Sequence, residues 1–164
     1  ACFSVVQYLG AREEKRVERT LQLVELGERD IYQAAQRAMR TRLVALAQRF
    51  QSEIKPNATD SEKALYSDRI GQLAMTADGG TMPVAEFQEH FDRVLYLLNR
   101  VGSCVNTDLC SPTVANDYYR DYAETFWAYF GGYIEARRQS GSPTLADPLK
   151  TWLQSSEQAP AAAP

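Results

Sequence analysis

The sequence predicts an all-α helical bundle with a long N-terminal helix. Apolar residues recur at spacings of three or four along most of the chain, and Ser, Thr or Asp stands where several of these patterns begin. Alternating β-branched runs that would indicate strands are missing from the sequence. With 164 residues, the chain has the length of one domain. We expect that domain over residues 1–153, with residues 1–10 as the end of a membrane anchor if one precedes them, followed by a flexible Pro/Ala tail over residues 154–164.

The charge balance excludes one class of partner. The formal net charge is -3, and 24% of the residues are charged. Nucleic-acid binding needs a basic field that neutralises phosphates, and a sequence pI near 5.3 does not provide it. We therefore expect no nucleic-acid partner.

The first predicted helix runs from Phe3 to Leu26, and its apolar side chains share a face at helical spacing: Val5, Val6, Leu9, Val17, Leu21 and Val24. The apolar run from Ala1 to Leu9 is about half of the ~20 residues that a bilayer requires. Basic residues follow it, mixed with glutamates. This pattern fits the exit turn of a membrane-spanning helix, and it fits an ordinary amphipathic helix end equally well. The chain starts with Ala-Cys, so Cys2 is also a candidate for lipid attachment at a lipobox.

Three further helices are expected in the middle of the chain. Asp30 caps a helix that continues until Pro56, and the T-x-x-E sequence from Thr59 to Glu62 is a capping box for the next one. After Pro83, the most regular apolar pattern runs from Val84 to Val101. We expect Leu95 and Leu98 of this helix to lie in the core.

An aromatic helix is expected from Ser111 and Pro112, which form a cap and first-turn proline, to about Arg138. Asp147 and Pro148 form the same combination of cap and first-turn proline before a last short helix. Because the aromatics of the long helix cover more than one face, some of them are candidates for a protein or membrane interface or for a ligand pocket. These candidates are Tyr118, Tyr119, Tyr122, Phe126, Trp127, Tyr129, Phe130 and Tyr133.

Two cysteines, Cys104 and Cys110, lie in a polar segment between helical patterns. A closed metal site needs four ligands, and only Cys2 and the single histidine, His90, could add to this pair. We therefore expect no metal site and favour a Cys104–Cys110 disulfide over free thiols. A disulfide implies an oxidising compartment, most simply the bacterial periplasm. The basic residues after Leu9 favour the cytoplasmic side, which is the alternative.

Catalytic patterns are sparse. A single histidine cannot build a zinc or di-iron site, and the glycine pairs lack the spacing of phosphate-binding loops. We expect no catalytic residue, no cofactor and no enzymatic activity.

The segment from Val84 to Trp152 resembles a bacterial family, domain of unknown function 4760. The similarity rests on VLYLLNRV at 94–101, NDYYRDYAETFWAYFGGYIEARRQ at 116–139 and GSPTLADPLKTWL at 141–153. The resemblance implies a membrane-spanning first helix followed by basic residues, and it carries over no reaction. The segment with Cys104 and Cys110 departs from the family pattern, because it is longer there.

Together these observations predict a non-catalytic, membrane-anchored accessory or interaction domain that contacts a partner protein or a second copy through helical surfaces. The membrane contact would come from a segment upstream of Ala1. The alternative is an extracytoplasmic ligand-sensing module with an aromatic-lined pocket. An enclosed pocket at Tyr122, Phe126 and Tyr129 would support sensing, and a packed interior with exposed apolar surface would support interaction.

Overall fold

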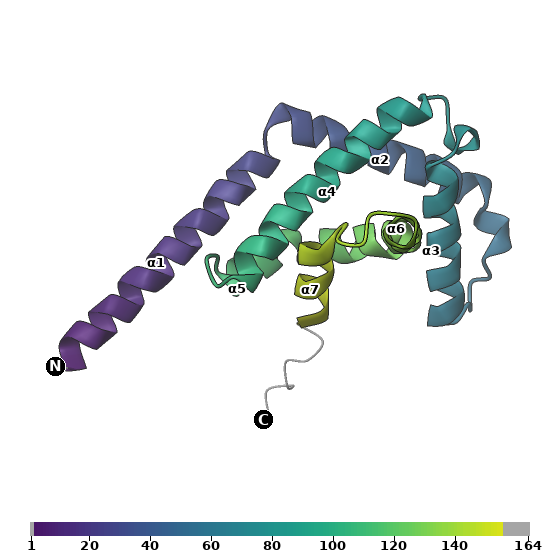
Figure 1. The fold of residues 1–164 in the computed structure, drawn as a ribbon. Helices are drawn as coiled ribbons and strands as arrows, with labels where there is room; N and C mark the ends of the chain where they lie inside the picture. Colours follow the sequence, from purple (N-terminus) through teal and green to yellow (C-terminus); the bar gives the residue numbers. More distant parts are fainter. Residues whose placement is uncertain (1, 156–164) are drawn as a thin grey trace. The chain divides into compact units, whose positions relative to one another are not determined.

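The computed structural model describes residues 2–155, with side chains from Ser4 onward. The longer helices are α1 (Cys2–Gly27), α2 (Asp30–Arg49), α3 (Asp60–Ala74), α4 (Val84–Asn106), α6 (Asp121–Gln139) and α7 (Asp147–Ser155) (Figure 1). The short helical turns are η1 (Gln51–Glu53), η2 (Ala77–Gly79), α5 (Pro112–Ala115) and the π turn η3 (Asn116–Arg120). Residues 2–155 contain no strand, so the all-α bundle with a long N-terminal helix is confirmed. The part of the predicted tail at 156–164 lies outside the described residues, as does the Cys2 side chain.

The chain groups into two compact units. Within the described residues, one unit contains α1, α5, η3, α7 and the C-terminal part of α4 from Tyr96. The other contains α2, α3, the N-terminal part of α4 and α6 from Glu124. Two of the four boundaries, at 95/96 in α4 and at 123/124 in α6, fall inside continuous helices.

In the unit that holds α1, the C-terminal part of α4 packs closely on the start of α7. A Cβ at Gly102 would lie 2.5 Å from the carbonyl oxygen of Pro148, so only glycine allows this approach. The Asn106 amide donates to the same carbonyl at 2.9 Å, and the Leu149 N–H donates to Asn99 Oδ1 at 3.2 Å. These contacts explain why α4 continues to Asn106, although the sequence pattern ended at Val101.

In the other unit, the core is a cluster of aromatic rings between α4 and α6. The Phe91 ring lies 5.5 Å from Phe126, 5.2 Å from Phe130 and 5.5 Å from Tyr133, measured between ring centroids. Close backbone packing brings α3 against α6, because a Cβ at Gly71 would clash with the backbone of Tyr129. A Cβ at Gly132 would likewise clash with the Asp68 carboxylate.

The helix starts follow the sequence signals. Thr59 and Glu62 form the predicted capping box, and Ser111 Oγ accepts from the Val114 N–H at 3.5 Å. The end of α2 differs from the prediction, because the helix stops at Arg49 and the turn η1 follows before Pro56.

The face predicted for α1 is wrong in register. In α1 the buried residues are Thr20, Leu23 and Gly27, whereas Val5, Val6, Leu9 and Leu21 are exposed. In the aromatic helix the buried series is Ala115, Tyr119, Ala123, Phe126, Phe130 and Ile134. The prediction was based on the largest apolar side chains. In the structure, small residues make the closest contacts between helices, so the buried faces include Ala, Gly and Thr.

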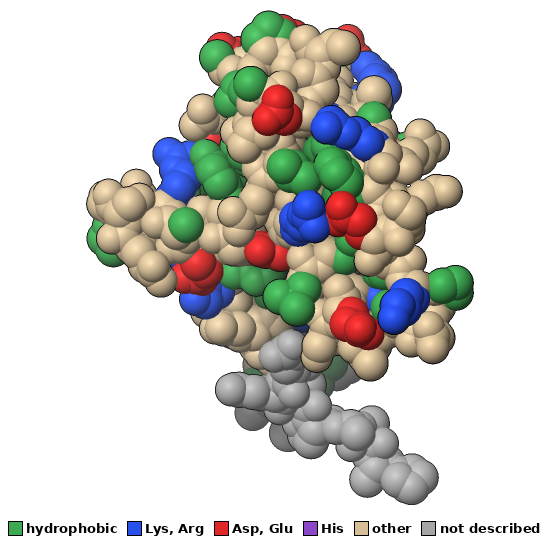
Figure 2. All heavy atoms as spheres, turned by 90° about the vertical axis from the view of Figure 1, so that its right-hand side faces the viewer, with side chains coloured by type: hydrophobic (Ala, Val, Ile, Leu, Met, Phe, Trp, Pro, Cys, Tyr) green, Lys and Arg blue, Asp and Glu red, His purple; other side chains and the backbone are tan. Residues whose placement is uncertain are grey.

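Figure 2 shows the surface on the side of the molecule where α3 lies in Figure 1. Hydrophobic side chains form small groups there, separated by Lys, Arg, Asp and Glu side chains. Scattered apolar side chains of this kind are normal for a protein surface and indicate no binding site.

Candidate interaction surfaces of α1 and the disulfide loop

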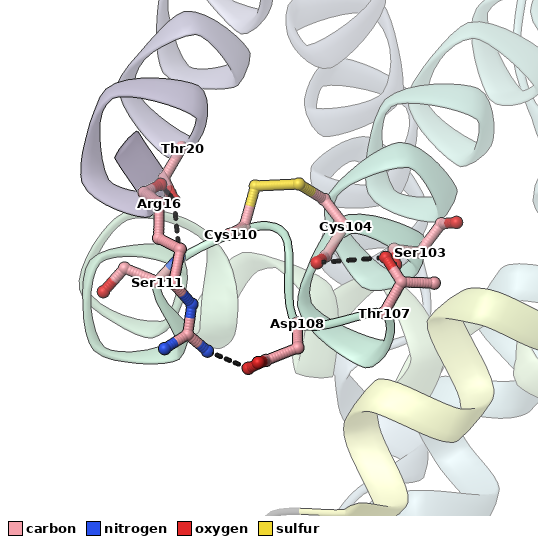
Figure 3. The surroundings of a disulfide bond; sticks show 8 residues. All are labelled: Arg16, Thr20, Ser103, Cys104, Thr107, Asp108, Cys110 and Ser111. Atoms are coloured by element: carbon pink, nitrogen blue, oxygen red, sulfur yellow. Dashed lines mark hydrogen bonds and ion pairs between the residues drawn. A yellow bond between two sulfur atoms is a disulfide. The ribbon is translucent and has the colours of Figure 1, made fainter. Parts of the chain in front are cut away.

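A disulfide joins Cys104 in the last turn of α4 to Cys110, with a Cα–Cα distance of 5.1 Å (Figure 3). The predicted bridge is therefore present in the structure. The N–H groups of Leu109 and Cys110 both donate to the Cys104 carbonyl at 3.0 Å, which closes the end of α4. Asp108 adopts a left-handed backbone conformation with φ of 62°, which aspartate tolerates better than most residues.

The bridged loop attaches to α1 within the same unit. Asp108 accepts from Arg12 at 2.5 Å. Figure 3 shows that it also pairs with Arg16. The buried Thr20 hydroxyl accepts from the Ser111 N–H at 2.9 Å and donates to the Arg16 carbonyl at 2.7 Å. Cys110 is also buried, so the bridge is half covered although the segment around it is polar. It therefore holds the loop that fixes α1.

The N-terminal end of α1 has no packed face. Every residue from Ser4 to Lys15 is exposed, including Val6 at 70% and Tyr8 at 68%. Val5 and Leu9 are likewise more than half exposed. Among residues 4–155, no helix is long and apolar enough to cross a membrane.

An acidic groove follows α1 on a side away from its buried residues. Its apolar members, Val17 and Leu21, stand between glutamates. We call this surface the acidic groove, and it is lined by Gly10, Glu13, Glu14, Val17, Glu18, Leu21, Gln22 and Glu25.

A second hollow lies between α1, α4 and the bridged loop. It carries three arginines over leucine side chains, and no acidic residue lines it. We call it the arginine cleft, and it is lined by Arg19, Gln22, Leu23, Leu26, Arg29, Arg100, Cys104 and Leu109. Leu109 also lines the cleft, and it belongs to the loop that the Cys104–Cys110 disulfide closes.

The aromatic candidates have different environments. Tyr118 is the most exposed of them, at 57%, and Tyr122, Trp127, Tyr129 and Tyr133 are half-buried. Tyr119 is buried, and its hydroxyl donates to the Leu23 carbonyl at 2.9 Å. Burial, with a smaller contribution from Glu28, raises the pKa of Tyr119 to about 12. Phe126 and Phe130 belong to the core, so the aromatic set does not form one surface.

Titratable groups show no assembled metal centre. In the part of the chain that the structure describes, no three His, Cys, Asp or Glu side chains gather as metal ligands. The His90 Nδ1 atom is buried and makes no hydrogen bond. Burial raises the pKa of Asp92 against the opposing effect of Arg137.

Sequence reasoning missed the polar residues that hold the fold together. Arg42, Asp108 and Thr20 all make contacts across long sequence separations, and their own neighbours give no indication of it. A buried Arg in an otherwise apolar helix position, as at Arg42, is the one signal that spacing could have provided.

The family described as Domain of unknown function (DUF4760) matches residues 2–151. The chain belongs to the DUF4760 family. The match extends beyond the C-terminal half and includes α1 and the disulfide loop. Comparison with curated proteins gave no significant match, and comparison with solved structures gave none either.

Proposed function

We propose that this DUF4760 domain is a non-catalytic interaction domain of a membrane-anchored protein, and that it contacts a partner protein through α1. The exposed N-terminal end of α1 carries this proposal. Four large apolar side chains, Val5, Val6, Tyr8 and Leu9, stand in solvent within two helical turns. Contiguous exposed apolar surface of this kind is typical of binding sites.

The helical state of this end gives a second reason. An isolated helix shorter than about 12–15 residues is marginal in water, because tertiary packing supplies most helix stability. Residues 4–15 bury no side chain, and the Arg12–Asp108 pair is their one long-range ion pair among the described residues. A partner that covers the apolar side chains would supply the missing stabilisation.

We infer from the disulfide on which side of the membrane the domain lies. Cys104–Cys110 supports an oxidising compartment, and we therefore favour the periplasmic side. The basic residues near the start of α1 weigh less for the cytoplasmic side, because two of them, Arg12 and Arg16, pair with Asp108 and have a structural role.

The alternative function, ligand sensing, has less support. The pocket expected from the sequence included Phe126, and that ring is stacked on Phe91 and packed against Phe130. A side chain that fills the core in this way cannot line an open pocket without moving.

Site-specific photo-crosslinking in the natural cell tests the proposal. A benzophenone amino acid at Leu9 or Leu21 should give a discrete crosslinked protein, because both side chains lie on the exposed surface of α1. Leu65 on α3 is the matched control, since it is a leucine with 72% exposure on another helix. Equal crosslinking from all three positions, or none, would contradict the proposal.

Fractionation tests the membrane part separately. The natural full-length protein should sediment with membranes and remain there in high salt, because hydrophobic anchoring is not screened by ions. Its recovery in the soluble fraction would contradict membrane anchoring and leave the crosslinking result valid.

A further inference from the structure

The acidic groove and the arginine cleft are complementary surfaces of one unit. We propose that the arginine cleft of one copy receives the acidic groove on α1 of a second copy, so that the domain self-associates. The inference rests on the proposed function, because it names a second copy as a partner that α1 contacts.

The cleft has unpaired positive charge. Arg19 and Arg29 form no ion pair with any described residue, and Arg100 contacts only the Tyr96 ring and hydroxyl, the latter at 3.2 Å. Three like charges around an apolar floor repel one another, and an acidic partner removes that repulsion. Guanidinium groups pair well with carboxylates because they offer paired N–H donors in a plane.

The spacing of the cleft arginines favours a partner segment with several separated carboxylates. Arg19 lies on α1, eight positions before its last residue Gly27, which corresponds to about 12 Å at the helical rise, and Arg29 lies in the turn that follows. A single phosphate or carboxylate is much smaller than this separation. The cleft therefore fits a segment with several carboxylates better than it fits a small anion or one lipid headgroup.

The acidic groove is such a segment on the same chain. Glu14 and Glu25 are eleven positions apart on α1, or about 16.5 Å, so the groove carries widely separated carboxylates. Between them stand Val17 and Leu21, which would face the leucines of the cleft floor. The charge of the groove and its apolar content both complement the cleft.

Pairing of two acidic grooves with each other is disfavoured. Four glutamates line the groove and no Lys or Arg does, so a symmetric contact of groove with groove would place like charges together. Contact of groove with cleft brings different surfaces together, which makes the interface heterologous. Such contacts close into rings or continue as open chains.

Sedimentation velocity of the purified, disulfide-bonded chain tests the inference with charge-reversal variants. We expect wild-type protein to associate as concentration rises and to dissociate in high salt. R19E/R29E makes both surfaces acidic, and E18R/E25R leaves the groove with two glutamates and two arginines and no net charge, so each variant alone should associate at least about tenfold more weakly. An equimolar mixture should recover association, because the unchanged groove of the R19E/R29E variant then meets the unchanged cleft of the E18R/E25R variant.

All four substituted side chains are exposed, and circular dichroism checks that each variant is folded. The control is R37E/R40E on α2, which makes the same change in net charge at exposed positions outside both surfaces. Three results would overturn the inference: a wild-type chain that stays monomeric, association that survives in both variants, or no recovery in the mixture. In each case a protein crosslinked through Leu9 would still support the proposed function.

Discussion

Arg42 is a buried charged side chain that donates hydrogen bonds to three backbone carbonyls. Its Nε donates to the Ala74 carbonyl at 2.8 Å, and its other nitrogens donate to Met82 at 2.8 Å and Thr76 at 2.7 Å. These carbonyls lie at the end of α3 and in the turn before α4, where backbone acceptors have no helical partner. The guanidinium also lies 4.6 Å from the centre of the Phe87 ring. Burial lowers the pKa of Arg42, and the hydrogen bonds to carbonyls offset the cost of that burial.

Replacement of Arg42 by Met should destabilise the domain. The change leaves three backbone carbonyls without their donor, and an unsatisfied buried polar group costs roughly 1–3 kcal/mol. Urea denaturation should therefore show a loss of at least about 1 kcal/mol. Arg37→Met on the exposed side of the same helix should change stability by less than about 0.5 kcal/mol. Equal effects of the two substitutions would show that Arg42 is not the link between α3 and α4.

Leu98 should behave as a core residue. It is fully buried, and its truncation to alanine should lower the free energy of unfolding by about 2–5 kcal/mol. Leu65→Ala, at an exposed position, is the control and should cost less than about 0.5 kcal/mol. Similar denaturation midpoints for the two variants would contradict the assigned core.

Tyr119 gives the domain a pH-dependent stability at alkaline pH. Its folded pKa is about 12, above the ordinary value of 10.0, so the folded state holds the phenol proton more tightly than the unfolded state. The resulting stability is complete below pH 10 and is lost as the pH rises from 10 to about 12. Tyr119→Phe should be less stable at neutral pH and should lose less stability across that interval. Parallel stability curves for wild type and variant would contradict this account.

At the scale of elements, the helix starts and the core face of α4 could be predicted, and the buried face of α1 could not. Thr59, Ser111 and Pro112 act on their own neighbours, so their capping roles are visible in the sequence. The buried side of α1 depends on Ser111 and Tyr119, which reach it from 91 and 96 positions away. A Cβ at Gly27 would clash with the Tyr119 hydroxyl, and no local pattern indicates that contact.

The features of the candidate site also divide into those that the sequence could predict and those that it could not. The disulfide could be predicted, because few ligands or partners were available to the two cysteines. The acidic groove and the arginine cleft could not, because each depends on the side of α1 that faces α4 and the bridged loop. Residues chosen for their aromatic character were divided between core and surface for the same reason.

The disulfide should order the loop more than it stabilises the domain. It closes a short ring, so loss of the bridge in C104S/C110S should cost only about 2 kcal/mol in the chain-entropy picture. The helical circular dichroism signal should persist, while the amides of residues 107–111 should exchange faster. Global unfolding of the variant at ambient temperature would show that the bridge holds the whole fold.

At the scale of the whole molecule, one side of α1 packs in its unit, and the proposed contacts use its exposed side chains. Thr20, Leu23 and Gly27 fix α1 to its unit, and the exposed apolar and charged side chains remain for partners. A net charge of only -3 conceals this arrangement, because four glutamates line one hollow and three arginines line the other. Local charge, rather than total charge, is therefore expected to decide the contacts.

Hydrogen–deuterium exchange tests the central claim most directly, because it reports which part of α1 a partner covers. The amides of residues 4–15 should exchange rapidly in the purified chain, where no side chain of this segment is buried. In the native assembly, isolated gently from its natural source, the same amides should be strongly protected, while those of α3 should be unchanged. Equal exchange of residues 4–15 in the two samples would contradict the claim that α1 is the interaction surface.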